Sequence, residues 1–251
     1  MTLPGDLSWF AGKVALVTGS TTGIGEAVAR RLAAVGASVV VNSVRSREAG
    51  EALAAELGEA MYVSADVADE DAAGRLVAET VARFGRLDIL VNNAGITRRI
   101  PLVDLEAATA AVWREILDTN LVGAWNVTRA AAPHLKAAGE AAVVNLTSLV
   151  AHRYFGSSIP YAVSKAALAH LTHILARVLG PEVRVNAVSP GFVATRWNEA
   201  QTERRAFVES NAPLRRVATA EEIAEVCLQL CRPSFITGVV VRVDGGMGLI
   251  V

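Results

Sequence analysis

A tyrosine and a lysine four residues apart could perform acid/base chemistry. Tyr161 and Lys165 open a segment of helical periodicity, so both side chains are expected on one face of a helix. A phenol titrates near pH ~10 in water, and a nearby ammonium group favours the phenolate and lowers the phenol pKa. Because such a pair alone is more often a core tyrosine beside a solvated lysine, its chemistry depends on its surroundings.

Two further polar residues could complete this group. Ser148 lies 13 residues before Tyr161, at the end of an apolar run predicted as a strand. Its hydroxyl could donate to a carbonyl oxygen that becomes negative as hydride arrives. Asn120 falls inside a long predicted helix, where an asparagine otherwise bonds the local backbone. Ser148, Tyr161 and Lys165 are the candidate catalytic residues.

A glycine-rich turn follows the first apolar run. Its candidate cofactor residues are Gly19, Ser20, Thr21, Thr22, Gly23, Ile24 and Gly25. Glycines allow the backbone to turn tightly and approach a pyrophosphate, whose charge meets the amides at a helix N-terminus. A plain strand-to-helix connection can also contain such glycines, but the position after the first strand favours a dinucleotide site.

The second predicted strand ends without the acid that usually binds the ribose hydroxyls of NAD. Ser43 occupies the expected acid position, and the next carboxylate is Glu48. Arg45 could pair with a 2′-phosphate as a planar, permanently charged fork. The alternative is that Arg45 is a solvated residue before the next helix. The sequence therefore favours NADP(H) over NAD(H).

The elements that must position these residues alternate between strands and helices. Apolar runs predict seven strands at residues 14–18, 38–42, 60–64, 87–92, 141–147, 183–188 and 239–243. Helical periodicity predicts helices at residues 24–35, 47–57, 70–84, 105–136 and 161–179. Continuous apolar strands are typical of parallel sheets covered on both faces. We therefore expect one α/β domain over residues 1–251, a doubly wound Rossmann fold with helices on both faces of the sheet.

Taken in order, the motifs resemble those of the short-chain dehydrogenase/reductase family. They are Thr18-Gly19-x-x-x-Gly23-x-Gly25, Asn92-Asn93-Ala94-Gly95, Tyr161-x-x-x-Lys165 and Pro190-Gly191. The resemblance implies an oxidoreductase that interconverts a ketone and a secondary alcohol with a nicotinamide cofactor. It implies that Asn120 is a fourth catalytic residue, which holds a water that links Lys165 to solvent. It also implies cofactor contacts from Asp66, Val67, Asn93, Ala94, Gly95, Tyr161, Lys165, Pro190, Gly191, Val193 and Thr195.

The substrate region is less sharply marked. The resemblance implies a lid at residues 196–212, and the candidate substrate residues are His152, Arg153, Tyr154, Phe155, Trp197 and Phe207. The chain looks most like 3-oxoacyl-acyl-carrier-protein reductases. Gly139 and Glu182, however, stand where arginines are expected to recognise the carrier, so an acyl-carrier partner stays open. A secondary-alcohol or sugar dehydrogenase using NAD is the alternative, and a nucleotide sensor without catalysis is a third reading.

Composition excludes several other classes. The 251 residues carry 24 basic and 25 acidic side chains, and a net charge of -1 argues against a nucleic-acid partner. No apolar run reaches the roughly 18 residues of a membrane span, and no secretory signal is evident. Cys227 and Cys231 without a nearby histidine favour core packing over a metal site. We expect a cytoplasmic enzyme with a small-molecule substrate; the resemblance implies a homotetramer.

Overall fold

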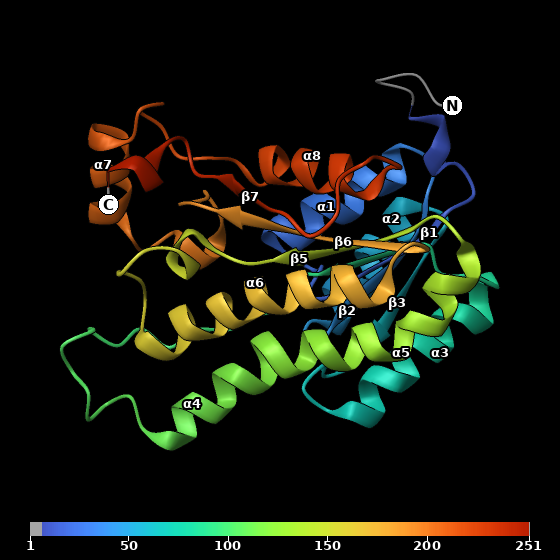
Figure 1. Ribbon diagram of the computed structural model, residues 1–251, viewed down its shortest axis with the longest axis horizontal. Coiled ribbons are helices and arrows are strands. Elements are labelled where there is room, and N and C mark those ends of the chain that lie inside the picture. The colour runs from blue at the N-terminus through green and yellow to red at the C-terminus, as the bar shows by residue number, and fades with distance from the viewer. Residues whose placement is uncertain (1–6, 251) are drawn as a thin grey trace.

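The computed structural model describes residues 7–250, which form a parallel seven-stranded sheet between two layers of helices (Figure 1). The strand order is β3-β2-β1-β4-β5-β6-β7. The strands are β1 (Val14–Val17), β2 (Ser38–Ser43), β3 (Ala60–Ser64), β4 (Ile89–Asn92), β5 (Ala141–Leu146), β6 (Val183–Pro190) and β7 (Val240–Val243). This arrangement confirms the doubly wound α/β fold.

Alternate residues of the central strands contribute to two separate cores. In β1, Ala15 and Val17 pack toward α1, α2 and α8, whereas Val14 and Leu16 pack toward α3, α5 and α6. The helices are α1 (Gly23–Ala34), α2 (Arg47–Leu57), α3 (Glu70–Phe84), α4 (Ala110–Leu117), α5 (Gly123–Ala138), α6 (Ile159–Leu179), α7 (Thr202–Asn211) and α8 (Ala220–Cys231). Because both faces are covered, the central strands have continuous apolar sequences rather than alternating ones.

The helix predicted over residues 105–136 is wrong in two respects. Residues 105–109 precede the helix, which begins at Ala110 after the N-cap Thr109. The helix is then interrupted by a π-helical segment, Asp118–Val122, between α4 and α5. Segments of this kind widen a helix locally and are frequent at functional sites. The predicted strand and helix lengths otherwise differ from those observed by a few residues at their ends, where local pattern is weakest.

Buried polar side chains connect β4 and β5 to the helices that cover them. Asn92 donates to Thr128 of α5 and to Asn145 of β5, both at 2.9 Å. Asn145 in turn donates to Thr172 of α6 at 2.9 Å. Such paired polar groups inside a core fix one arrangement of the elements. Asn92 thereby braces the centre of the sheet against α5.

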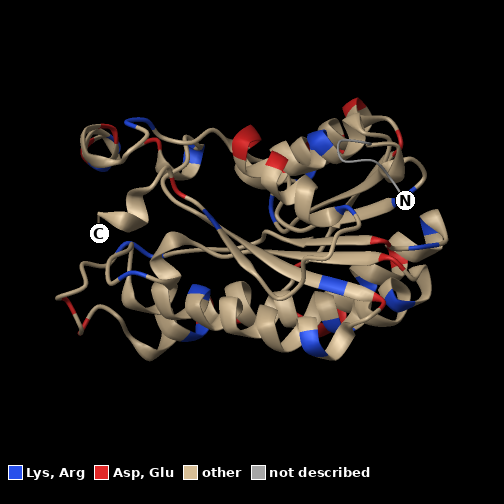
Figure 2. Cartoon of the chain, turned by 45° about the horizontal axis from the view of Figure 1, so that its top comes forward, with Lys and Arg blue, Asp and Glu red and all other residues tan. Residues whose placement is uncertain are grey.

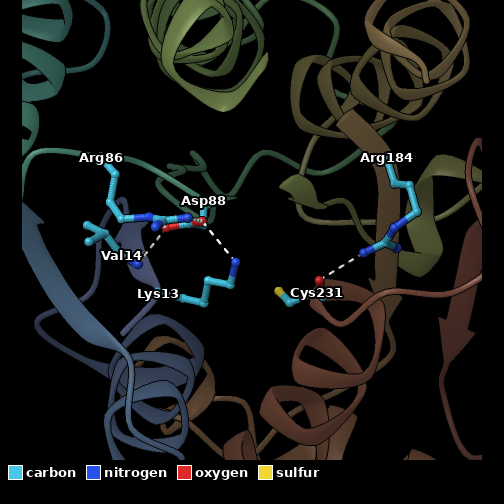
Figure 3. A network of polar contacts seen from close by, with 6 residues as sticks. All are labelled: Lys13, Val14, Arg86, Asp88, Arg184 and Cys231. Carbon is cyan, nitrogen blue, oxygen red and sulfur yellow. Dashed lines mark hydrogen bonds and ion pairs between the residues drawn. The ribbon is translucent and has the colours of Figure 1, made fainter. Parts of the chain in front are cut away.

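Charged groups lie at the amino-terminal end of the sheet, where the strands begin (Figure 3). The buried carboxylate of Asp88 accepts from the backbone of Val14 at 2.9 Å and from Arg86 at 2.6 and 2.8 Å. Lys13 adds an ion pair at 3.4 Å. This network ties the start of β1 to the residues before β4. Arg184 of β6 similarly donates to the carbonyl oxygen of Cys231 at the end of α8.

The surface carries charges of both signs on the helices of both layers (Figure 2). Within residues 7–250, no helix combines the length and apolar character of a membrane span. The same residues contain no cluster of three or more His, Cys, Asp or Glu side chains arranged to hold a metal. Cys227 and Cys231 are buried free thiols, and burial raises the pKa of both, with that of Cys231 at about 12.

Candidate active site

The glycine-rich turn lies between the end of β1 and the start of α1. Its first glycine, Gly19, has a φ of 61°, and a Cβ there would lie 2.8 Å from the Cα of Ala94. A Cβ on Gly25 would lie 2.5 Å from the carbonyl oxygen of Gly19. Only glycine fits these positions, because the turn, the helix and the segment after β4 pack backbone against backbone. Asn93 secures the packing by donating to the carbonyls of Thr18 and Gly19.

The start of α1 is suited to an anion. The N-cap residue Thr22 makes no side-chain hydrogen bond to the helix, so the first amides of α1 lack that usual acceptor. Gly23 and Ile24 line a cavity of about 350 Å³ at this point. Free amides and the helix dipole together favour a phosphate group. The residues present therefore fit the pyrophosphate of a dinucleotide.

This first cavity extends from the glycine-rich turn to the carboxyl ends of β4, β5 and β6. Most of the predicted cofactor residues line it: Gly19, Thr22, Gly23, Ile24, Ser43, Asp66, Val67, Asn93, Ala94, Gly95, Tyr161, Lys165, Pro190, Gly191, Val193 and Thr195. Ser148 and Trp197 line it as well. Segments far apart in the sequence thus meet at one edge of the sheet, as expected of a doubly wound fold.

Asn120 lies within the π-helical segment and connects two parts of the site. Its Oδ1 accepts from the backbone amide of Ile96 at 2.7 Å, and its Nδ2 donates to Ser164 of α6 at 3.0 Å. A Cβ on Gly95 would lie 3.2 Å from Asn120 Oδ1 and 3.3 Å from Lys165 Nζ. Asn120 therefore holds the segment after β4 against the helix that carries Tyr161 and Lys165.

The first two turns of α6 present the acid/base pair. The N-cap residue Ser158 accepts from the backbone amide of Tyr161, which fixes the start of the helix. Lys165 follows one turn later, and its Nζ donates to the carbonyl oxygen of Leu146 at 2.8 Å. Ser148 stands two residues beyond that carbonyl, at the carboxyl end of β5. The strand and the helix together bring the three predicted catalytic side chains to one place.

Burial dominates the acid/base properties of the pair. It raises the pKa of Tyr161, while the Ser148 hydroxyl and the positive charge of Arg204 oppose that rise. Burial also lowers the pKa of Lys165 to about 8. The Lys165 ammonium donates to the Leu146 carbonyl and lies 5.9 Å from the centroid of the Tyr161 ring. That Lys165 lowers the phenol pKa stays a prediction, and Arg204 adds a second positive charge that acts in the same direction.

A second cavity of about 440 Å³ adjoins the first. The two share Ser148, Tyr161, Gly191 and Asn198. Its walls come from the loop after β4, the loop after β5 and the predicted lid, which contains α7. Figure 1 shows that helix α7 and the loop that precedes α4 lie at the same end of the sheet. Val208 of α7 packs in a small apolar cluster with Leu149, Ala212, Val217 and Met247, which attaches the lid to the body.

Several predicted site residues lie elsewhere. Neither cavity is lined by Ser20, Thr21, Gly25, Arg45, Asn120, His152, Arg153 or Tyr154. Ser20 and Gly25 support the glycine-rich turn from within, and Arg45 and Tyr154 are exposed. Burial and the charge of Arg242 lower the pKa of His152. Of the predicted substrate residues, Phe155 and Phe207 line the second cavity, whereas Trp197 lines the first.

Other cavity residues were not predicted from the sequence as site residues. In the first cavity they are Asn42, Val44, Ala65, Ile96, Thr119, Leu146, Thr147, Arg196 and Asn198. In the second they include Arg99, Leu102, Phe192, Gln201, Arg204, Val208 and Met247. Many of these residues directly follow a strand, and this position could have identified them as site residues. Those of the lid have no such signal, because the chain returns to the site only in three dimensions.

Comparison with known proteins agrees with this geometry. A short-chain dehydrogenase model, described as enoyl-(acyl carrier protein) reductase, matches residues 19–248. The chain is 52% identical over 240 residues to a ketoacyl reductase of the granaticin polyketide synthase from Streptomyces violaceoruber, covering 94% of this chain and 96% of that protein.

The chain belongs to the short-chain dehydrogenase/reductase family.

Two further matches in this family extend the comparison. The 3-oxoacyl-[acyl-carrier-protein] reductase of Thermotoga maritima is 36% identical over 244 residues, covering 94% of this chain and 98% of that protein. The structure of a gluconate 5-dehydrogenase from Burkholderia cenocepacia, in complex with NADP and tartrate, superposes with a TM-score of 0.90 at 32% identity, covering 98% of this chain and 99% of that one.

Membership in this short-chain dehydrogenase/reductase family defines the reaction class. The protein is an oxidoreductase that interconverts a ketone and a secondary alcohol with a nicotinamide cofactor. The first cavity contains the features that such a cofactor needs, and the second cavity provides a separate space beside Tyr161 and Ser148.

Proposed function

We propose that this protein is a carbonyl reductase that favours NADP(H), with Tyr161 as the general acid/base. One observation carries the proposal: the first and second cavities meet at Ser148 and Tyr161. A cofactor in the first cavity and a ketone in the second would both be in contact with these side chains. When bound, the nicotinamide cofactor supplies hydride in reduction and accepts it in oxidation.

Ser148 and Tyr161 both act on the oxygen of the substrate. The Ser148 hydroxyl donates a hydrogen bond to the carbonyl oxygen, which gains negative charge during reduction. The Tyr161 hydroxyl then gives its proton to that oxygen. Because burial raises the pKa of Tyr161, the phenol is protonated at neutral pH and is ready to donate. Oxidation of the alcohol requires the phenolate, so the oxidative direction is expected to gain with rising pH.

Lys165 and Asn120 support this step. We assign Lys165 to the nicotinamide ribose and to electrostatic support of the phenolate, because its ammonium lies at the wall of the first cavity on the helix of Tyr161. Asn120 positions that helix through Ser164 and positions the segment after β4 through Ile96. A water held by Asn120 would return protons from solvent to Lys165 and then to Tyr161.

Cofactor choice is assigned from the end of β2. Ser43 and Val44 line the cavity at the place where NAD-binding relatives need an acid for the ribose hydroxyls. The Ser43 hydroxyl is engaged with Tyr62 at 2.9 Å. Arg45 is exposed beside this point and is free to turn toward a 2′-phosphate. An exposed cation with no acid beside it favours NADP(H) over NAD(H).

A 3-oxoacyl thioester is the second candidate substrate. It is favoured by the names of two relatives, the ketoacyl reductase of the granaticin polyketide synthase and the 3-oxoacyl-[acyl-carrier-protein] reductase of Thermotoga maritima. The two candidates share the reduction step at Ser148 and Tyr161, and they differ in what occupies the second cavity beyond the ketone.

We further propose that the protein is a cytoplasmic homo-oligomer. Exposed apolar side chains lie on α5 and α6; they include Trp125, Val163, Ile174 and Val178. Contiguous exposed apolar surface often marks an interface. Two free thiols are compatible with a reducing compartment.

Oxidation of NADPH in the presence of a panel of ketones and 3-oxoacyl thioesters tests the proposal. Wild-type protein is expected to reduce at least one ketone and to prefer NADPH to NADH. Tyr161→Phe removes the donated proton and is expected to lower kcat by about a hundredfold or more, while the affinity for NADPH stays within a few-fold. Full turnover in Tyr161→Phe would contradict the acid role.

A further inference from the structure

The second cavity carries two guanidinium groups near the reacting centre. Arg204 of α7 and Arg99 of the loop after β4 both line it, together with Tyr161 and Ser148. Both residues line this one cavity, and the pKa of Arg204 is lowered by burial first and by the charge of Arg99 second. Two like charges that share a cavity repel, and an anion between them relieves the repulsion. This pair is outside the cofactor cavity.

Arg204 has no acceptor of its own. It is half-buried, and within residues 7–250 it forms neither an ion pair nor a hydrogen bond; its guanidinium lies over the ring of Phe155, 5.2 Å from the centroid. Other half-buried arginines have partners: Arg31 donates to Glu225 at 2.8 Å, and Arg184 donates to the Leu230 carbonyl at 2.9 Å. A guanidinium drawn from water without acceptors is unfavourable.

The residues that line the cavity supply no counter-charge for Arg204. No Asp or Glu of the described chain lines it, and most of its wall is apolar. Arg99 is fixed by a hydrogen bond of 2.8 Å to the carbonyl oxygen of Trp197 in the lid. Arg99 is thus held in place by the lid backbone, whereas Arg204 extends from α7 into a space without negative charge. A ligand must bring the acceptor.

We infer that the substrate carries a carboxylate that Arg204 and Arg99 bind a few bonds from the reacting ketone. This inference rests on the proposed function of the site. A planar guanidinium matches the two oxygens of a carboxylate. Arg204, Arg99, Tyr161 and Ser148 line the same cavity, so an anionic group bound by the arginines shares that cavity with the carbonyl. The phosphate of a carrier-bound thioester is separated from its 3-oxo group by the whole pantetheine arm and cannot occupy this place.

The rest of the cavity indicates the carbon skeleton. Its volume of about 440 Å³ and walls that include Leu102, Phe155 and Phe207 suit a small apolar carbon skeleton. The substrate class is therefore a small keto acid, and the product of its reduction is the corresponding hydroxy acid.

A matched pair of ketones tests this inference: 4-oxocyclohexanecarboxylate and its neutral methyl ester. The kcat/KM of each is measured with NADPH for wild type, Arg204→Met and Arg205→Met. Arg205 is the control because it is exposed on the same helix and pairs with Glu209 at 2.8 Å. We expect wild type to have a higher kcat/KM for the acid than for the ester. Arg204→Met is expected to lower the ratio of the kcat/KM for the acid to that for the ester by about tenfold. Arg205→Met is expected to leave this ratio unchanged.

The outcomes separate the inference from the proposed function. An acid-to-ester ratio near one in wild type, or an equal loss for both ketones in Arg204→Met, overturns the carboxylate site while the reductase assignment stands. If wild type reduces neither ketone, calorimetry with cyclohexanecarboxylate and cyclohexanecarboxamide in the presence of NADP⁺ decides. The carboxylate site is supported if cyclohexanecarboxylate binds, the carboxamide does not, and Arg204→Met loses the binding of the carboxylate. If cyclohexanecarboxylate does not bind to wild type, the carboxylate site is overturned.

Discussion

Replacement of Lys165 by methionine is expected to stabilise the fold while it removes activity. Lys165 is buried, and its pKa is lowered from 10.5 to about 8 by burial. In the unfolded chain its pKa is the ordinary one. Below pH 8 the ammonium is therefore charged in both states, and the folded state bears the cost of holding that charge out of water. At about 1.4 kcal/mol per pH unit, this cost is about 3 kcal/mol.

The direction in which the stability difference changes with pH follows from the lowered pKa of Lys165. Between pH 8 and 10.5 the folded protein loses the proton before the unfolded chain does, so the penalty disappears as the pH rises through this window. Methionine has a similar length and no charge, but it leaves the Leu146 carbonyl without its 2.8 Å donor, a loss of about 1 kcal/mol at either pH. We therefore expect Lys165→Met to be about 2 kcal/mol more stable than wild type at pH 7 and slightly less stable near pH 10.5.

Urea unfolding at pH 7 and pH 10.5, at one protein concentration and without cofactor, measures this difference. Lys136→Met, which removes an exposed ammonium group from α5, controls for the loss of one positive charge. If the difference between Lys165→Met and wild type is the same at both pH values, burial does not depress the Lys165 pKa and the reasoning fails. A stabilised, inactive variant would show that the site holds this charge at the expense of stability.

Two other substitutions test the cofactor assignment and the framework. Arg45→Ala is expected to raise the dissociation constant for NADPH about tenfold, because a phosphate loses a guanidinium partner, and to leave that for NADH unchanged; equal effects in fluorescence titrations would refute the 2′-phosphate contact. Asp88→Ala removes the buried acceptor of Val14, Arg86 and Lys13. It should cost about 3 to 5 kcal/mol, seen as a fall in Tm of roughly 10 °C, and a fall of under about 2 °C would contradict this.

The sequence predicted the fold because its signals are local. Continuous apolar runs mark the buried parallel strands, and the glycines at positions 19 and 25 mark a place where backbone meets backbone. The same holds for Ser148, Tyr161 and Lys165, since a strand end and the first turns of a helix meet at the carboxyl edge of any doubly wound sheet. Their assembly required only the order of the elements. The helix over residues 105–136 was wrong because apolar periodicity does not reveal a late start or a π-helical segment.

The side chains that the lid brings to the second cavity, and the charges around the phenol, were decided by tertiary structure. Arg204 stands 43 positions after Tyr161 in a charge-rich segment that is typical of a solvated helix face. Only the return of α7 over the second cavity places its guanidinium beside the phenol and Arg99. The direction of the Lys165 ammonium toward Leu146 is likewise a matter of packing. The sequence alone therefore predicted the candidate catalytic residues, whereas the tertiary structure decided their electrostatic environment, because burial and charge act through space.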